Sequence, residues 1–193
     1  PKDTDERYWA AAALYKAFGD AKYRTDFEKM ASLEILHGYG WEEVGSFGNQ
    51  AYLSTRKYPV SSELIQKIEE QILKKAEELE AKAQLDPYGV AFSEEDYVWG
   101  SNMYAAENGN HFYDAYMITK NQQYLDLARN QLHYLLGKNS CGYCYVTGFG
   151  YCSPKYPHHR PSSAQKQAME GMLVGGPDFG LHDPAAVEFL QAK

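Results

Sequence analysis

The sequence predicts an all-α protein assembled from helical hairpins. Apolar residues recur three and four positions apart in six separate stretches, which is the spacing of a helix face that packs on a core. Glycine, proline or a capping residue separates these stretches. No stretch alternates apolar and polar residues beside a hairpin turn, so we expect little β-structure.

Punctuating residues place the helices along the chain. Gly19 ends the first helix, Asp20 caps the second, Pro59 closes the third, and Ser61 or Ser62 caps the fourth. The fourth helix has the clearest apolar stripe: Ile65, Ile68, Ile72, Ala76, Leu79 and Ala83. The six helices are predicted at residues 5–18, 21–37, 41–56, 62–83, 101–119 and 121–136.

The fifth and sixth helices differ in character. The fifth is unusually polar for an interior helix, because it contains Asn102, Asn108, Asn110 and His111. The sixth has the apolar stripe Leu125, Ala128, Leu132 and Leu135. After a long loop, the tail from Pro184 is predicted to form a helical turn or two. Three hairpins of about fifty to sixty residues each amount to roughly half of a toroid built from six helix pairs.

Composition excludes several classes of partner. The chain has 193 residues, which is enough for one sizeable core, and a formal net charge of −7, which argues against a nucleic-acid partner. No apolar run approaches the roughly 20 residues of a membrane span. The chain begins at Pro1 rather than Met, so we expect a processed or excised piece, whose N-terminus does not report its compartment.

The loop after the sixth helix carries the most distinctive motifs. It is rich in Gly, Tyr, His and Pro, and loops of this length are usually either functional or disordered. Its Phe, Val and Tyr residues argue against disorder. Its motifs are Val146-Thr147-Gly148-Phe149-Gly150, Pro157-His158-His159-Arg160 and Leu173-Val174-Gly175-Gly176-Pro177.

This ordered series resembles the C-terminal part of the catalytic domain of family 9 glycoside hydrolases, which are mostly secreted cellulases. Trp99-Gly100-Ser101-Asn102 and the helix pairs extend the resemblance over nearly the whole chain. It implies that residues 1–193 are an incomplete portion of a single (α/α)6-barrel domain. It also implies hydrolysis of β-1,4-glucosidic bonds in cellulose or related β-glucans by an inverting, endoglucanase-like enzyme that is secreted or extracellular.

The two carboxyl groups of such an enzyme are not assigned in this chain. Inversion uses a general acid and a general base roughly 6.5–9.5 Å apart. The family's base lies in an Asp-Ala-Gly-Asp motif, which does not occur here, and the chain ends before the family's acid motif. Glu188 lies near the expected place but lacks the neighbouring Asn-Ala of the family, so it is not assigned. We therefore expect this chain to be inactive and unstable without the remainder of the domain.

The chain instead carries candidate substrate-binding residues. By resemblance, His158 is the active-site histidine that hydrogen-bonds a glucose hydroxyl, and Arg160 contacts the sugar. Trp99, Tyr104 and Trp41 resemble the aromatic residues that line the family's cleft. The alternative for Trp99 is a core position. We expect His159 to support the structure rather than contact sugar.

Metal and thiol assignments remain open at the level of the sequence. Glu42 stands where the family has an Asp near a structural calcium site, so no cofactor is required but calcium is possible. Cys141, Cys144 and Cys152 could be small buried thiols, form one local disulfide, or hold zinc with a nearby histidine.

Two other functions compete with the hydrolase. A non-hydrolytic carbohydrate-binding helical domain would keep His158, Arg160 and Trp99 and lack both carboxylates even at full length. A zinc-stabilised helical interaction module is the second rival, which metal analysis would decide.

Overall fold

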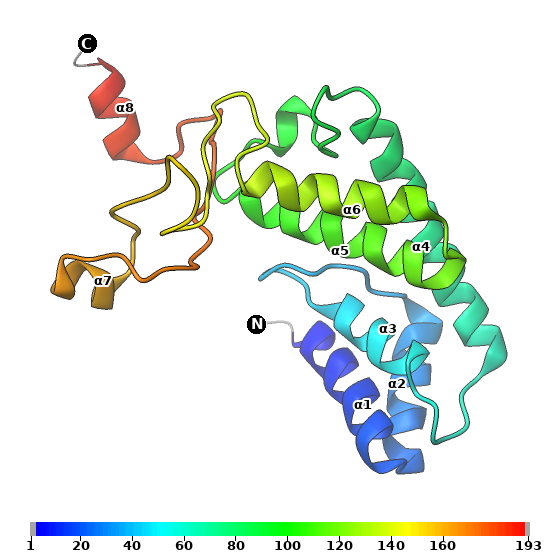
Figure 1. The fold of residues 1–193 in the computed structure, drawn as a ribbon. Coiled ribbons are helices and arrows are strands. Elements are labelled where there is room, and N and C mark those ends of the chain that lie inside the picture. Colours follow the sequence, from blue (N-terminus) through cyan, green and yellow to red (C-terminus); the bar gives the residue numbers. More distant parts are fainter. Residues whose placement is uncertain (1–2, 192–193) are drawn as a thin grey trace. The chain divides into compact units, whose positions relative to one another are not determined.

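The computed structural model describes residues 3–191, and the regular structure within them is helical (Figure 1). The only β-feature in that range is one isolated antiparallel bridge between Val146 and Leu173. The elements are α1 (Thr4–Phe18), α2 (Ala21–Leu33), α3 (Gly45–Leu53), α4 (Ser62–Ala83), the 3-10 turn η1 (Glu94–Asp96), α5 (Asn102–Thr119), α6 (Gln122–Leu135), α7 (Arg160–Gln165) and α8 (Pro184–Gln191). The all-α fold class predicted from the sequence is confirmed.

The predicted helix ends are confirmed by their hydrogen bonds. Gly19 follows α1 in the left-handed conformation, with φ of 74°, and its N–H donates to the carbonyl of Tyr15 at 2.8 Å. The Asp20 side chain accepts from Lys22 N at 2.9 Å and so caps α2. Of the two serines proposed for the start of α4, Ser61 accepts from Leu64 N at 3.2 Å.

Several boundaries differ from the prediction. The second helix ends at Leu33 rather than at residue 37, and the third ends at Leu53 rather than at residue 56. The third helix begins at Gly45 rather than at residue 41. The reason is Glu43, whose carboxylate accepts from the backbone N–H groups of His37, Gly38 and Gly45 and thereby fixes a loop. In the region predicted to be a continuous long loop, residues 160–165 form the short helix α7.

The chain divides into two compact units. Residues up to Glu77 together with Asp114–Lys120 form the first unit, and Glu78–Tyr113 together with the residues from Asn121 form the second. In the first unit α1 packs against α2 and α3. The fit of α3 on α1 is tight at Gly48, because a Cβ there would lie 2.7 Å from the Tyr8 ring.

Aromatic rings fill the core of the first unit. Phe27 is fully buried between Tyr8 and Tyr52, with a ring-centroid distance of 4.6 Å to each. The Tyr8 hydroxyl donates to the buried amide oxygen of Asn49 at 2.6 Å. These contacts explain the many tyrosines of the first helices as core residues whose polar tips find partners.

The second unit has its own core on the paired helices α5 and α6, which run side by side (Figure 1). Buried residues of this core are Val90, Phe92, Ala105, Tyr134, Leu135 and Tyr145. The buried Gln131 side chain accepts from Ala91 N at 3.0 Å and donates to Gly89 O at 2.9 Å. The buried Asn108 donates to Ala91 O at 3.0 Å, so two amides hold the segment before η1 against the helix pair.

The predicted apolar stripes need two corrections. On α6 the buried positions are Tyr124, Gln131, Tyr134 and Leu135, whereas Leu132 is 53% exposed. Periodicity missed Gln131 because its polar atoms are satisfied by backbone groups. On α4, Leu64 is buried where the sequence pointed to Ile65. Within residues 3–191, no helix has the length and apolar character needed to cross a lipid bilayer.

Candidate active site

The long loop (residues 138–178) is fixed at its start by Asn139. This buried side chain donates from Nδ2 to the carbonyls of Tyr134 and Tyr143, at 2.9 and 2.8 Å. Its Oδ1 accepts from Cys141 N and Tyr143 N, at 3.2 Å each. One amide therefore uses all four of its hydrogen-bonding positions to shape the turn after α6.

The end of the long loop is fixed by the first residues of α5. The buried Asn102 donates from its backbone N to Gly175 O and from Nδ2 to Val174 O, both at 2.9 Å. The Ser101 hydroxyl donates to Pro177 O at 2.6 Å. The polar character of the fifth helix is therefore used to bind loop backbone, which joins the Trp-Gly-Ser-Asn and Val-Gly-Gly-Pro motifs in space.

His158 and Arg160 lie at the start of α7 and are both exposed. Among the described residues 3–191, neither side chain forms a hydrogen bond or an ion pair. His159, between them, is the N-cap of α7, with its ring Nδ1 accepting from Ser162 N at 3.4 Å. Pro157 on the other side is buried, so the motif alternates anchored residues with exposed ones.

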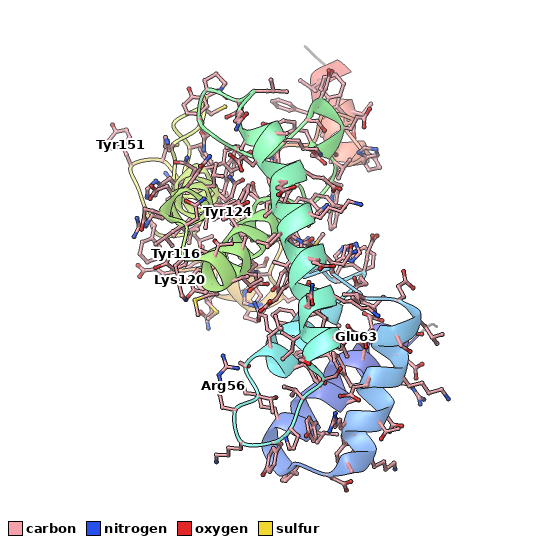
Figure 2. The ribbon with its side chains drawn as sticks, turned by 90° about the vertical axis from the view of Figure 1, so that its right-hand side faces the viewer. Arg56, Glu63, Tyr116, Lys120, Tyr124 and Tyr151 are labelled. Carbon is pink, nitrogen blue, oxygen red and sulfur yellow. The ribbon has the colours of Figure 1, made fainter. Side chains whose placement is uncertain are left out.

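The predicted aromatic residues have different degrees of exposure. Trp99 is 69% exposed, which contradicts the core alternative within this chain. Tyr104 is half-buried and packs against the core of the second unit. Other exposed aromatic residues of this unit include Phe149, Tyr151, Tyr156 and Phe179. Figure 2 shows Tyr151 projecting outward from the loop.

Trp41 belongs to the first unit, where it is 76% exposed on the Trp41 loop (residues 34–44, between α2 and α3). The loop is held by Glu43, as described above, and by Tyr39, whose hydroxyl donates to the buried Asp114 carboxylate. Gln50 Nε2 donates to Tyr39 Oη at 2.6 Å and to Asp114 Oδ1 at 2.8 Å. Burial raises the pKa of Asp114, although the hydrogen bonds from Tyr39 and Gln50 oppose this shift.

No side-chain set for a metal ion is present within residues 3–191, since no three His, Cys, Asp or Glu residues cluster there. Glu42 is exposed, and the neighbouring Glu43 carboxylate is occupied by backbone N–H groups. Within residues 3–191, Glu42 is therefore not joined by other acidic side chains that could bind calcium with it. Calcium binding stays a prediction.

The three cysteines are free thiols. Cys144 is buried, as one interpretation predicted, but Cys141 and Cys152 are exposed, so that interpretation is wrong for them. The backbone N of Cys144 donates to Cys152 O at 2.9 Å, which closes the segment between them.

The acidic residues near the end of the chain lie in different environments. Partial burial opposes the shift, but hydrogen bonds from His182 hold the pKa of Asp178 below its usual value. Asp178 Oδ1 lies 2.7 Å from His182 Nδ1 and is engaged in that contact. Glu188 on α8 is exposed. Neither residue is assigned as the general acid or base.

Sequence reasoning missed the residues that hold the loop. Asn139 and Thr147 are buried polar residues whose side chains each bond more than one backbone group, and the buried Ser162 hydroxyl contacts Met169 N and the His159 ring. The available signal was their position, because Thr147 lies inside a glycine-flanked motif and Ser162 lies three residues after a potential N-cap.

Comparison with known proteins identifies the family. Residues 1–192 match the family model described as glycosyl hydrolase family 9. A xyloglucan-specific endo-β-1,4-glucanase of Bacteroides ovatus is 33% identical over 188 residues, which are 94% of this chain and 32% of that protein. A cellodextrinase of Butyrivibrio fibrisolvens is 31% identical over 202 residues, covering 96% of this chain and 36% of that protein.

Solved structures agree. AaCel9A in complex with cellobiose-like isofagomine matches 100% of this chain and 37% of its own, with 33% identity and a TM-score of 0.86. The family 9 endoglucanase J30 matches with a TM-score of 0.88 and 28% identity. The chain therefore spans about a third of the length of these relatives. The chain belongs to glycosyl hydrolase family 9, and its helices form part of the (α/α)6 barrel that the sequence predicted.

Proposed function

We propose that this chain is the substrate-binding part of a secreted, inverting β-1,4-glucanase, and that residues outside it supply the general acid and base. Relatives that match it are named as endoglucanases and a cellodextrinase. The rest of the same catalytic domain is then its partner, and a β-glucan is its substrate. Trp99 and Trp41 stack on glucose rings, and any calcium is structural.

The observation that carries this proposal is the exposed pair His158 and Arg160 on a capped helix start. Their side-chain nitrogens have no partner among the described residues 3–191, and their backbone is anchored on both sides by buried residues. An imidazole and a guanidinium offer donors that fit sugar hydroxyls. In the transition state, a hydrogen bond that His158 accepts from a glucose hydroxyl beside the cleaved bond strengthens, because the positive charge that develops on the ring makes the hydroxyl a better donor.

The test uses the full-length enzyme that carries this chain. His158→Ala is expected to lower kcat by about 30- to 1,000-fold, by analogy with the loss of about 2–4 kcal/mol for a transition-state donor. Arg160→Ala is expected to weaken binding of cello-oligosaccharides and raise KM. His133→Ala, which removes an exposed histidine of α6, is the matched control. If His158→Ala keeps full turnover, its proposed role is wrong.

The alternative is a non-hydrolytic carbohydrate-binding domain, which the same exposed residues would also support. The two functions differ in product. Incubating the full-length protein with a soluble cellulose derivative and following reducing ends distinguishes them. Release of products with inverted anomeric configuration supports the hydrolase, whereas binding without release supports the alternative.

A further inference from the structure

The Val-Thr-Gly motif contains a fully buried hydroxyl with no role in the function proposed above. The Thr147 side chain donates from Oγ1 to Met169 O and accepts from Met172 N at 2.9 Å. Its backbone N donates to Met172 O at 3.0 Å, and its carbonyl accepts from Gly171 N at 2.8 Å. One threonine thus binds the turn that follows α7 through four hydrogen bonds.

The same turn is bound from the side of α7 by Ser162. This hydroxyl is buried, accepts from Met169 N at 3.2 Å, and lies 2.9 Å from His159 Nδ1. The backbone of Met169 therefore lies between two side chains, because its carbonyl accepts from Thr147 and its N–H donates to Ser162.

The donors and acceptors along this connection have one consistent direction. His159 Nδ1 already accepts from Ser162 N, so it has a lone pair and cannot donate to the serine. The Ser162 hydroxyl must then donate to Nδ1. The connection runs from Met172 N–H through Thr147 Oγ1, the carbonyl and N–H of Met169, and Ser162 Oγ to the His159 ring.

We propose that Thr147 and Ser162 are positioning residues for His158 and Arg160. They act by fixing the ring of His159, which caps α7 and lies between the two exposed side chains. The inference rests on the proposed sugar-binding role of that pair. It predicts that the ring proton of His159 lies on Nε2, because Nδ1 is an acceptor.

The kinetic test compares substitutions that differ by one group in the full-length enzyme. Thr147→Val keeps the shape and removes the hydroxyl, and it should lower kcat/KM roughly tenfold to a hundredfold, because small misplacements of binding groups are costly. Thr147→Ser keeps the hydroxyl and should restore most of the activity. Thr55→Val, which removes a buried hydroxyl bonded to Ala51 O in the first unit, should leave kcat/KM unchanged.

Combining substitutions shows whether the effect passes through the exposed pair. In an enzyme that already carries His158→Ala and Arg160→Ala, adding Thr147→Val should produce little further loss of kcat/KM. If Thr147→Val lowers kcat/KM as much in that double variant as in the native enzyme, the positioning role is overturned, since Thr147 then acts elsewhere. Full activity of the double variant would instead contradict the proposed function, which keeps the two failures distinct.

A spectroscopic measurement does not depend on activity. Nitrogen-15 NMR of labelled histidines should show His159 as the Nε2–H tautomer in the native enzyme. Ser162→Ala and Thr147→Val should both perturb that signature, whereas Thr55→Val should not. A His159 signal that is already protonated on Nδ1 in the native enzyme, or is indifferent to both substitutions, would refute the connection.

Discussion

Two loops carry three of the candidate sugar-binding residues, Trp41 on one and His158 and Arg160 on the other, and these loops are held in different ways. The Trp41 loop is fixed by two carboxylates, Glu43 and the buried Asp114. The long loop is fixed mainly by neutral groups, the amides of Asn139 and Asn102 and the hydroxyls of Thr147 and Ser162. Both loops lack regular structure over most of their length, so side chains replace the hydrogen bonds that a helix would supply.

The difference between charged and neutral supports predicts that the two loops respond differently to pH and to mutation. A carboxylate accepts several N–H groups at once and binds them strongly, but its contribution depends on its ionisation. An amide or hydroxyl binds each partner more weakly and is indifferent to pH over the physiological range. The order of the Trp41 loop should therefore vary with the ionisation of Glu43 and Asp114, while the amide and hydroxyl contacts of the long loop should respond only to the removal of individual side chains.

The largest effect is expected from Asn139→Ala. It removes four hydrogen bonds at a buried site, at a net cost of about 2–4 kcal/mol in unfolding free energy. Chemical unfolding of the full-length enzyme measures the loss. Asn130→Ala, which removes one exposed contact with Lys138, should cost only a few tenths of a kcal/mol. Equal costs for the two substitutions would show that Asn139 does not organise the long loop.

A smaller effect is expected from Glu43→Gln. The substitution keeps the size of the side chain but replaces one acceptor oxygen with an NH2 group that faces backbone donors. We expect a loss of about 1–2 kcal/mol and faster hydrogen exchange in residues 34–44. Glu42→Gln, at the exposed neighbouring position, is the control. Unchanged hydrogen exchange in residues 34–44 would contradict the role of Glu43 in holding the Trp41 loop.

The contrast between the loops also shows what could be predicted from the sequence. Helix ends at Gly19 and Asp20 were predictable, because a left-handed residue and an N-cap are local chemistry. The start of α3 was not, because Glu43 binds backbone groups on both sides of itself instead of continuing a helix. Gln131 was missed for a related reason, as its partners at Gly89 and Ala91 are distant in sequence.

At the candidate site, the sequence identified residue types but not their supports. His158, Arg160 and Trp99 were predicted through a family resemblance, and their exposure agrees with contact to a ligand. The connection from Thr147 to His159 joins residues twelve positions apart through a turn that follows both of them in the chain. No periodicity or motif spacing encodes such a path, since it depends on where the turn folds back.

The smallest effects, and the sharpest test of the comparison, concern pH. Burial raises the pKa of Asp114, so between its unfolded value of 3.8 and its raised native value the folded state binds more protons than the unfolded state. Stability contributed by this residue is therefore present at low pH and lost as pH rises through that window. Asp114→Asn should abolish this fall, which thermal unfolding of the full-length enzyme at a series of pH values would detect.

Asp96 in the second unit supplies the opposite case. Burial opposes the shift, but hydrogen bonds from Lys82 and Ser93 hold the pKa of Asp96 below its usual value of 3.8. The stability that Asp96 contributes is fully present above pH 3.8 and is lost as the pH falls through its lowered native pKa. Because Lys82 and Asp96 are partly exposed, the effect should stay below about 1 kcal/mol. Asp96→Asn should thus remove a rise in stability with pH where Asp114→Asn removes a fall. If both substitutions change the pH profile in the same direction, the hydrogen bonds from Tyr39 and Gln50 lower the pKa of Asp114 by more than burial raises it.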